Sequence, residues 1–229
     1  MTEQKKPRHT LPGDIERTSM AIITGELEQR GIALLPGTEA VVRRVIHTTA
    51  DFDYAESLRF TPGAVAAAVA ALKAGADIIT DTNMARSGVS KPSLSRLGRE
   101  VCCYMAEPQV AQAAREQGTT RAVAAVRYAA QRHSSALFAV GNAPTALLAL
   151  CDLMEETAFR PAAVIGVPVG FVNVVESKER LMAVCARLGV PAIAAMGRKG
   201  GSNVAAAICN ALIYTAVDAL DPVNRGWQG

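Results

Sequence analysis

Two stretches with helical spacing of apolar residues open the chain. The first covers residues 12–31, where Asp14 is expected to cap the first turn and Gly31 to end the helix. Its apolar stripe is predicted from Ile15, Ile22 or Ile23, and Leu27. A second helix is predicted to begin after Thr38 and to carry His47 in or just beyond its last turn. The side chains expected to face inward from it are Val41, Val42, Val45 and Ile46.

From residue 61 onward, short apolar runs alternate with amphipathic helices. Helices are predicted over residues 61–75, 107–118, 119–133, 144–157, 176–189 and 202–217. Strands, with their exit turns, are predicted over residues 76–82, 99–105, 135–143, 162–172 and 191–201. This alternation predicts right-handed βαβ units and a Rossmann-like α/β fold, with a mainly parallel sheet covered by helices on both faces. We expect one domain over residues 1–229, with residues 1–13 and 218–229 as loose tails.

Glycine, proline and polar residues follow four of the predicted strands, in residues 81–93, 141–146, 167–179 and 196–203. The carboxyl ends of parallel strands meet at one edge of a sheet, where ligands bind in α/β proteins. Helix N-termini there favour anions. Positive side chains in or beside these segments are Arg86, Lys91, Lys178, Arg198 and Lys199. We therefore expect an anionic ligand that touches several loops, although ordinary turn chemistry could explain any one of them.

Composition and charge exclude several classes of protein. The formal net charge is only +3 and no Lys/Arg run is interleaved with aromatic residues, so we expect no nucleic-acid partner. No apolar run is long enough to span a bilayer, and the polar start lacks the core of a secretion signal. The five cysteines form no CxxC pair and cluster with no histidines, which indicates reduced thiols and no metal site. We expect a cytoplasmic protein without membrane partners.

The three histidines are His9, His47 and His133. His9 lies in the polar start, and His133 ends a predicted helix, where an imidazole can offset terminal carbonyls. His47 could do the same, but Arg44 lies three residues earlier and so shares its helix face. An arginine that holds an anion beside a titratable imidazole suits acid catalysis. The pattern alone leaves both roles open for His47.

Four motifs in order carry a resemblance to a known family. They are "RRVIHTTADFDYA", "GNAPTALLAL", "PVGFVNVVESKE" and "GRKGGSNVAAAICNAL", with "TDTNMARSGV" and "TTRAVAA" between the first and second. Their order and spacing, from about Ile15 to Leu212, resemble the precorrin-8X methylmutase family of cobalamin biosynthesis. The wording "HTTADFDYA" is closer to the cobalt-precorrin-8 branch.

The resemblance implies an isomerase that moves a methyl group from C-11 to C-12 of a tetrapyrrole, giving cobyrinate or hydrogenobyrinate. Such a reaction needs no redox cofactor, methyl donor or metal cofactor, and family members are homodimers. The family's catalytic histidine falls on His47, which would protonate the macrocycle, and its substrate-contacting serine and arginine fall on Ser19 and Arg44. Asp51 and Asp53 are then turn and capping residues. Further substrate-binding positions that we expect from the loops are Thr82, Arg86, Arg121, Asn142, Lys178, Arg198 and Gly200.

The sequence allows two other functions. A tetrapyrrole-binding carrier could keep the fold without the activity. A nucleotide-dependent α/β enzyme is disfavoured, because neither a GxGxxG fingerprint nor a complete P-loop is present.

Overall fold

A six-stranded sheet forms the centre of the computed structural model, which describes residues 10–226. The strands are β1 (Leu58–Phe60), β2 (Ile78–Thr80), β3 (Val101–Cys102), β4 (Leu137–Val140), β5 (Ala163–Gly166) and β6 (Ala192–Ala195), and their spatial order is β1-β6-β5-β4-β2-β3. Neighbouring strands from β6 to β3 are parallel, and β1 pairs antiparallel with β6. The predicted α/β class with a mainly parallel sheet is confirmed.

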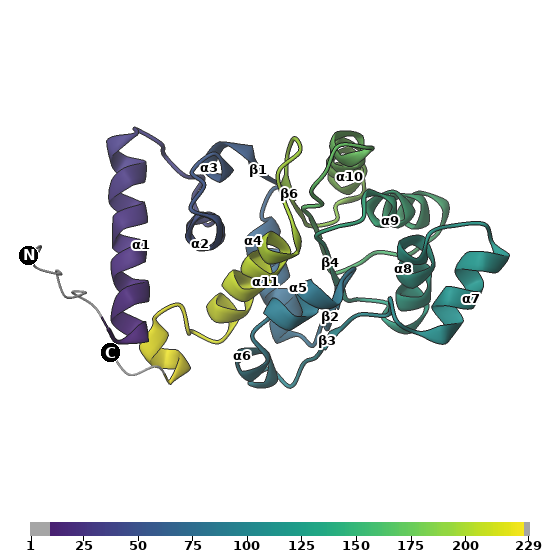
Figure 1. Ribbon diagram of the computed structural model, residues 1–229, viewed down its shortest axis with the longest axis horizontal. Helices are drawn as coiled ribbons and strands as arrows, with labels where there is room; N and C mark the ends of the chain where they lie inside the picture. Colours follow the sequence, from purple (N-terminus) through teal and green to yellow (C-terminus); the bar gives the residue numbers. More distant parts are fainter. Residues whose placement is uncertain (1–9, 227–229) are drawn as a thin grey trace, which may run out of the picture.

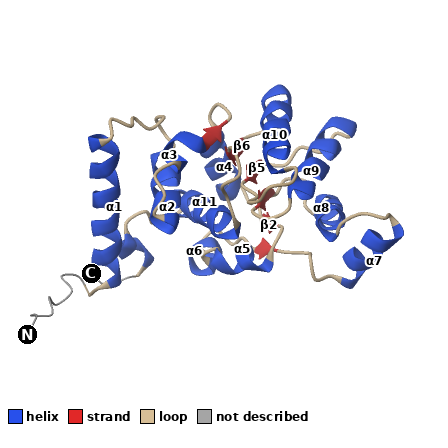
Figure 2. Ribbon diagram, turned by 45° about the horizontal axis from the view of Figure 1, so that its top comes forward, coloured by secondary structure: helices blue, strands red, loops and turns tan. Residues whose placement is uncertain are grey.

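Helices cover both faces of the sheet (Figures 1 and 2). On one face, α4 (Ala64–Lys73) and α11 (Ser202–Ala216) contact the strands. On the same face α5 (Asn83–Gly88) contacts β2, and α1 (Pro12–Gln29), α2 (Glu39–Thr49) and α6 (Lys91–Ser95) lie beyond. The other face carries α7 (Pro108–Glu116), α8 (Arg121–Arg132), α9 (Pro144–Glu156) and α10 (Val174–Leu188). Strands β4, β5 and β6 are apolar throughout because both of their faces are buried.

Helix α1 lies at one end of the molecule and differs in part from its prediction (Figure 1). Ile23 and Leu27 are buried as predicted, whereas Ile15 and Ile22 are 46% and 56% exposed. Asp14 pairs with Arg17 at 2.6 Å and caps nothing, since the N-cap position is Leu11. These differences arise because α1 packs on α2 and the C-terminal turn through one narrow face, which leaves its outer face uncovered.

Helix α2 matches its prediction closely. Its four expected apolar side chains are buried, and His47 lies in its last turn. Thr38 is the N-cap residue, but its hydroxyl donates to the carbonyl of Leu35 rather than accepting a helix N–H. The short α3 (Tyr54–Ser57) and strand β1 follow it. They were not predicted, and neither were α5 and α6, because these short elements mix apolar with polar residues and show neither a helical period nor an apolar run.

The C-terminal segment is not a loose tail over residues 218–226, and that expectation is wrong. A 3₁₀-helix, η1 (Pro222–Arg225), packs beside the start of α1 (Figure 1). Arg225 is buried against Glu16, and Arg96 donates to the carbonyls of Val217 and Asn224. Ion pairing and these backbone contacts order the segment. Residues 1–9, which include His9, and 227–229 lie outside the described part of the chain.

Candidate active site

The four strand-exit loops meet at one edge of the sheet, as predicted. The N–H of Gly201 donates to the carbonyl of Val167 at 2.8 Å, which joins the loops after β6 and β5. The hydroxyls of Thr82 and Ser202 are 2.8 Å apart, which joins the exit of β2 to the start of α11. Asp81, at the β2 exit, joins the β4 exit to it by accepting hydrogen bonds from backbone N–H groups there. The edge is therefore one connected surface built from four strands.

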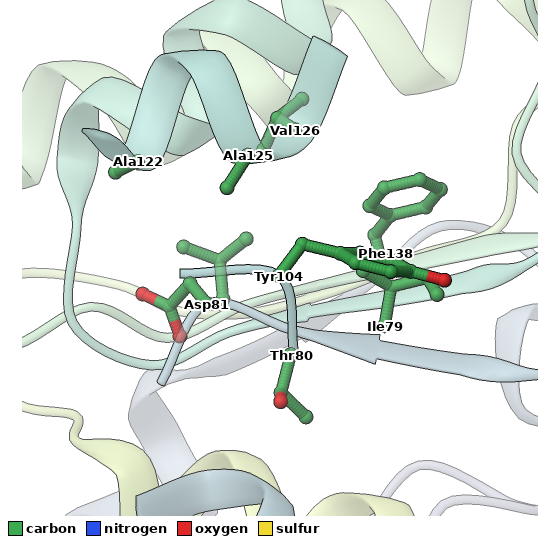
Figure 3. Close-up of a pocket in the computed structure, with 9 residues that line it drawn as sticks. Ile79, Thr80, Asp81, Tyr104, Ala122, Ala125, Val126 and Phe138 are labelled. Atoms are coloured by element: carbon green, nitrogen blue, oxygen red, sulfur yellow. The ribbon is translucent and has the colours of Figure 1, made fainter. Parts of the chain in front are cut away.

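Asp81 fills the anion-binding position at the start of α9. Its carboxylate accepts the N–H groups of Gly141, Asn142 and Ala143, each at 2.8 Å. Burial raises the pKa of Asp81, and these three bonds oppose that rise. Between this carboxylate and α8 lies an internal cavity of only about 10 Å³, room for about one water (Figure 3). A ligand anion therefore cannot use the α9 N-terminus and must bind outside it.

Lys178 holds the loop between β6 and α11 through hydrogen bonds to the loop backbone. Its side chain is fully buried, and its ammonium donates to the carbonyls of Gly197 at 2.9 Å and Lys199 at 2.8 Å. Burial lowers the pKa of Lys178 to about 8. Gly200 completes the loop, because a Cβ there would lie 2.1 Å from the carbonyl oxygen of Val167. The expected substrate contact by Lys178 is therefore not available in this conformation, and the lysine holds the loop in place.

The same loop is tied to the segment after His47. The Lys199 ammonium lies 2.7 Å from a carboxylate oxygen of Asp51 and 2.6 Å from one of Asp53. Lys199 lowers the pKa of Asp51, and the carboxylate of Asp51 also accepts the N–H of Asp53 within the turn. The two aspartates thus act in a turn, as expected, and also bring the end of α2 to the strand-exit edge.

Arg198 extends from this loop over an exposed aromatic ring. Its guanidinium carbon lies 5.4 Å from the ring centroid of Phe171, whose side chain is 83% exposed. Val172, next in the chain, is also exposed. The edge of the sheet therefore presents apolar surface and positive charge together.

His47 is half-buried on α2, within the electrostatic field of three charged side chains. Burial lowers its pKa below the ordinary 6.5, and Arg44 lowers it further. Glu16 raises the pKa of His47, and Arg225 lowers it. The surroundings thus favour the neutral imidazole and make its protonated form a stronger acid.

Arg44 belongs to a buried cluster rather than pointing freely into solvent. It donates to Glu16 at 2.6 Å, and its guanidinium lies 5.2 Å from the ring centroid of Tyr214. A pocket of about 380 Å³ opens beside this cluster between α1, α2 and the C-terminal segment. Its lining residues are Met20, Glu39, Ala40, Arg43, Arg44 and Leu220. Within residues 10–226, the Nε atoms of Arg43 and Arg44 are buried without a hydrogen-bond partner.

The other predicted residues fall in different places. Ser19 is half-buried on α1, and its hydroxyl donates to the carbonyl of Ile15 in its own helix. Thr82 caps α5 by accepting the N–H of Ala85, and Asn142 is exposed at the β4 exit. Arg121 is exposed in the first turn of α8.

Arg86 lies at the far edge of the sheet from β1 and β6. Its Nε donates to the carbonyl of Val101 in edge strand β3, beside an open cavity of about 520 Å³. The structure therefore brings His47 and Arg44 together near the β6 exit loop and leaves Arg86 apart from them.

Three residues near His47 were missed from the sequence. Arg43 stands beside Arg44 in the motif, and its position four residues before His47 could have identified it. Glu16 and Arg225 carried no local signal, because they are 209 positions apart and meet only in the folded chain.

Residues 10–226 contain neither a cluster of metal ligands nor a helix that could span a membrane. No group of three or more His, Cys, Asp or Glu side chains is placed to hold a metal ion there. Among the helices of that part of the chain, none combines the length and the hydropathy needed to cross a membrane.

Comparison with known proteins identifies the family of this chain. Residues 14–215 match the family model described as precorrin-8X methylmutase. The cobalt-precorrin-8 methylmutase of Salmonella typhimurium is 49% identical over 180 residues, which cover 78% of this chain and 82% of that protein. The precorrin-8X methylmutase of Pseudomonas aeruginosa is 41% identical, with 86% and 93% covered. The solved structure of the precorrin-8X methylmutase from Thermus thermophilus superposes with a TM-score of 0.79 at 43% identity, covering 89% of this chain and 98% of that one. The chain belongs to the precorrin-8X methylmutase family.

Proposed function

We propose that this protein is an isomerase of cobalamin biosynthesis that moves a methyl group from C-11 to C-12 of precorrin-8 or its cobalt complex. The family membership gives the reaction. The observation that carries the proposal is the placement of His47, a half-buried imidazole within the electrostatic field of Arg44, which itself lines a pocket.

His47 serves as the general acid. Protonation of the macrocycle draws electron density towards the ring, which eases migration of the methyl group with its bonding electrons. The C-11 to methyl bond breaks as the C-12 to methyl bond forms, and the proton is released when the product relaxes. General acid catalysis contributes roughly 10²- to 10⁴-fold. Because burial and Arg44 lower the pKa of His47, its protonated form gives up its proton readily.

The substrate carries many carboxylates around its rim, and the site offers cations to match them. Arg44 and Arg43 line the pocket, and Arg198 extends from the β6 exit loop. A charge-assisted hydrogen bond is worth about 1.5–3 kcal/mol. Polar groups proposed to lie around the ring are Ser19, Thr82, Asn142 and the backbone at Gly200. Lys178 acts indirectly, by holding the loop that carries Arg198.

We propose that the active form is a homodimer that pairs through the outer face of α1. Leu11, Ile15 and Ile22 share that face and are 47%, 46% and 56% exposed, which is unusual for a row of large apolar side chains on a monomer. Ile22→Asp is expected to shift the mass in light-scattering chromatography from dimer to monomer.

We further propose that the physiological substrate carries cobalt. One relative named for cobalt-precorrin-8, that of Salmonella typhimurium, is 49% identical, and one named for precorrin-8X, that of Pseudomonas aeruginosa, is 41% identical. The cytoplasm is the proposed location, since the five cysteines are free thiols.

The test is to mix purified protein separately with cobalt-precorrin-8 and with metal-free precorrin-8 and to follow the absorption spectrum. We expect conversion of the cobalt form to cobyrinate and of the metal-free form to hydrogenobyrinate, and we expect the cobalt form to react faster. A stable coloured complex whose spectrum does not change with time would instead identify a tetrapyrrole carrier.

A further inference from the structure

The loop between β5 and α10, residues 167–173, exposes apolar side chains at its tip. Val169, Phe171 and Val172 are 48%, 83% and 76% exposed, whereas Val167 and Pro168 at the start of the loop are buried. Apolar surface in contact with water is unfavourable, so neighbouring exposed apolar side chains mark a contact with something outside the subunit. The tip is therefore a candidate binding surface.

Hydrogen bonds and backbone geometry fix both ends of this loop. The N–H of Gly201 donates to the carbonyl of Val167 at 2.8 Å, and the N–H of Gly170 donates to the carbonyl of Arg198 at 3.3 Å. At the other end, Asn173 adopts a left-handed conformation with φ +58°, which turns the chain into α10. The β6 exit loop thus holds the tip in place, and the apolar side chains are presented on a fixed support.

A positive charge lies directly beside the tip. The guanidinium carbon of Arg198 lies 5.4 Å from the centroid of the Phe171 ring, and the arginine is exposed. Its neighbour Lys199 pairs with Asp51 and Asp53, but Arg198 has no carboxylate partner within residues 10–226. The surface therefore combines an apolar face with an unpaired cation. A ligand that has an apolar face and an anionic rim matches both features.

We propose that Phe171 is a substrate-binding residue: its ring, with Val172 beside it, lies against one face of the macrocycle, while Arg198 holds a carboxylate on the rim. The inference rests on the proposed function, because it concerns how that substrate is held. A tetrapyrrole is broad, conjugated and largely apolar on its faces, and an aromatic side chain packs against such a face in an offset stack. Burial of Phe171 and Val172 by the substrate removes their apolar surface from water.

The position and size of the tip favour the substrate over a second protein chain. The tip lies beyond the carboxyl ends of β5 and β6, where ligands bind in α/β proteins. Lys199, next to Arg198, pairs with Asp51, which follows His47 by four residues, so the tip and His47 belong to one connected edge. Three side chains cover only a few hundred Å², short of the roughly 800 Å² that each partner gives to a standard protein interface. Helix α10, which the loop enters, also lies away from α1, the proposed pairing face, in Figures 1 and 2.

The affinity of the protein for cobyrinate, measured by equilibrium dialysis, tests this inference without turnover. Phe171→Ala removes the aromatic face and is expected to raise the dissociation constant by about tenfold, the effect of losing one stacking contact. Phe171→Trp keeps an aromatic face and is expected to stay within about threefold of the natural value. Leu35→Ala is the control, because Leu35 is 61% exposed and lies before the start of α2, at the opposite end of that helix from His47. The control is expected to keep the natural affinity.

A double-mutant cycle separates direct contact from an effect that passes through Arg198. We expect Phe171→Ala to weaken cobyrinate binding by the same factor, within about threefold, in the natural protein and in Arg198→Gln. Arg198→Gln is also expected to lessen the dependence of the dissociation constant on salt, whereas Phe171→Ala keeps that dependence. If Phe171 only positioned Arg198, Phe171→Ala would have no effect in Arg198→Gln, and that result would overturn the stacking role.

Kinetics and molecular mass distinguish a substrate contact from a subunit contact. In Phe171→Ala, KM is expected to rise by about tenfold with kcat nearly unchanged, because the ring contacts substrate and transition state alike. Light-scattering chromatography is expected to give the natural mass for this variant. A lower mass with natural cobyrinate affinity would identify the tip as a contact between subunits and overturn the inference. Natural affinity and natural KM in Phe171→Ala would overturn it as well.

The fold of the variants and the proposed function are checked separately. Phe171 is 83% exposed, so Phe171→Ala is expected to keep the natural melting temperature. If that variant does not fold, Phe171→Leu keeps an apolar side chain without the aromatic face and is expected to bind cobyrinate at least about threefold more weakly; natural affinity in it would contradict the inference. A natural protein that binds cobyrinate but does not convert cobalt-precorrin-8 would refute the proposed function only, and the affinities would still decide the role of Phe171.

Discussion

The buried ammonium of Lys178 makes a quantitative prediction about stability and pH. Burial lowers its pKa from 10.5 to about 8, a difference of about 2.5 pH units. At 1.36 kcal/mol per unit, the folded state carries a penalty of about 3 kcal/mol below pH 8, which disappears as the pH rises towards 10.5. The sign follows from protons bound, because between these values the unfolded chain holds more protons than the folded one, so this contribution to stability increases with pH.

The variant that tests this is Lys178→Met, which keeps the length of the side chain and removes the charge. Two-state linkage with pKa values of 8 and 10.5 gives a recovery of about 2 kcal/mol for the natural protein between pH 7 and pH 9.5, and none for the variant. Urea unfolding followed by circular dichroism, at one protein concentration, measures both free energies. Subtracting the free energy of unfolding of the variant from that of the natural protein at each pH removes the contributions of cysteines and other lysines, which titrate in both proteins.

The same variant separates loop positioning from global stability. The carbonyls of Gly197 and Lys199 lose their donor, so the loop that carries Arg198 loosens and KM is expected to rise by about tenfold. A difference in unfolding free energy that is equal at pH 7 and pH 9.5 would refute the reasoning about the buried charge. An unchanged KM would refute the reasoning about the loop.

Two further predictions concern the strand-exit loops. Gly200→Ala is expected to destabilise the fold by about 3 kcal/mol or more, because its Cβ would lie 2.1 Å from the carbonyl oxygen of Val167. The control is Gly189→Ala, with φ +68° and open space around the Cβ, which should cost only about 1–2 kcal/mol. Thermal melting compares the stability of the two variants. Asp81→Asn replaces a carboxylate that accepts three backbone N–H groups by an amide that also presents N–H donors to them. The free energy of unfolding in urea is therefore expected to fall by about 2–4 kcal/mol. A fall of less than about 1 kcal/mol would argue against Asp81 as the residue that holds the start of α9.

The sequence predicted the elements that have a clear period. The central strands are short and wholly apolar, and the helices between them are long enough to show a stripe, so the parallel sheet and the convergence of its exit loops could be predicted. Strand β1 could not, because Arg59 interrupts its apolar run and its antiparallel pairing with β6 depends on where α2 and α3 place it. The exposure of Ile15 and Ile22 likewise depends on how little of α1 is covered.

The residues of the candidate site could be predicted only where they lie within one sequence motif. The spacing of Arg44 and His47 put them on one helix face but left the role of His47 open, and only the resemblance to the family made His47 the proposed acid and Arg44 a substrate contact. Lys178 was placed in the right loop region but given the wrong task, since sequence does not reveal that its ammonium turns inward to two carbonyls. Glu16 and Arg225 could not be found, because their pairing exists only after the two ends of the chain fold together.

The most direct test of the central claim is the turnover of His47→Ala with cobalt-precorrin-8, followed by absorption and compared with its affinity for cobyrinate. We predict that the variant binds cobyrinate about as well as the natural protein and that kcat falls by roughly 10²- to 10⁴-fold, the contribution of a general acid. A His47→Ala protein with natural affinity and near-natural kcat would contradict the proposed role of His47 as proton donor.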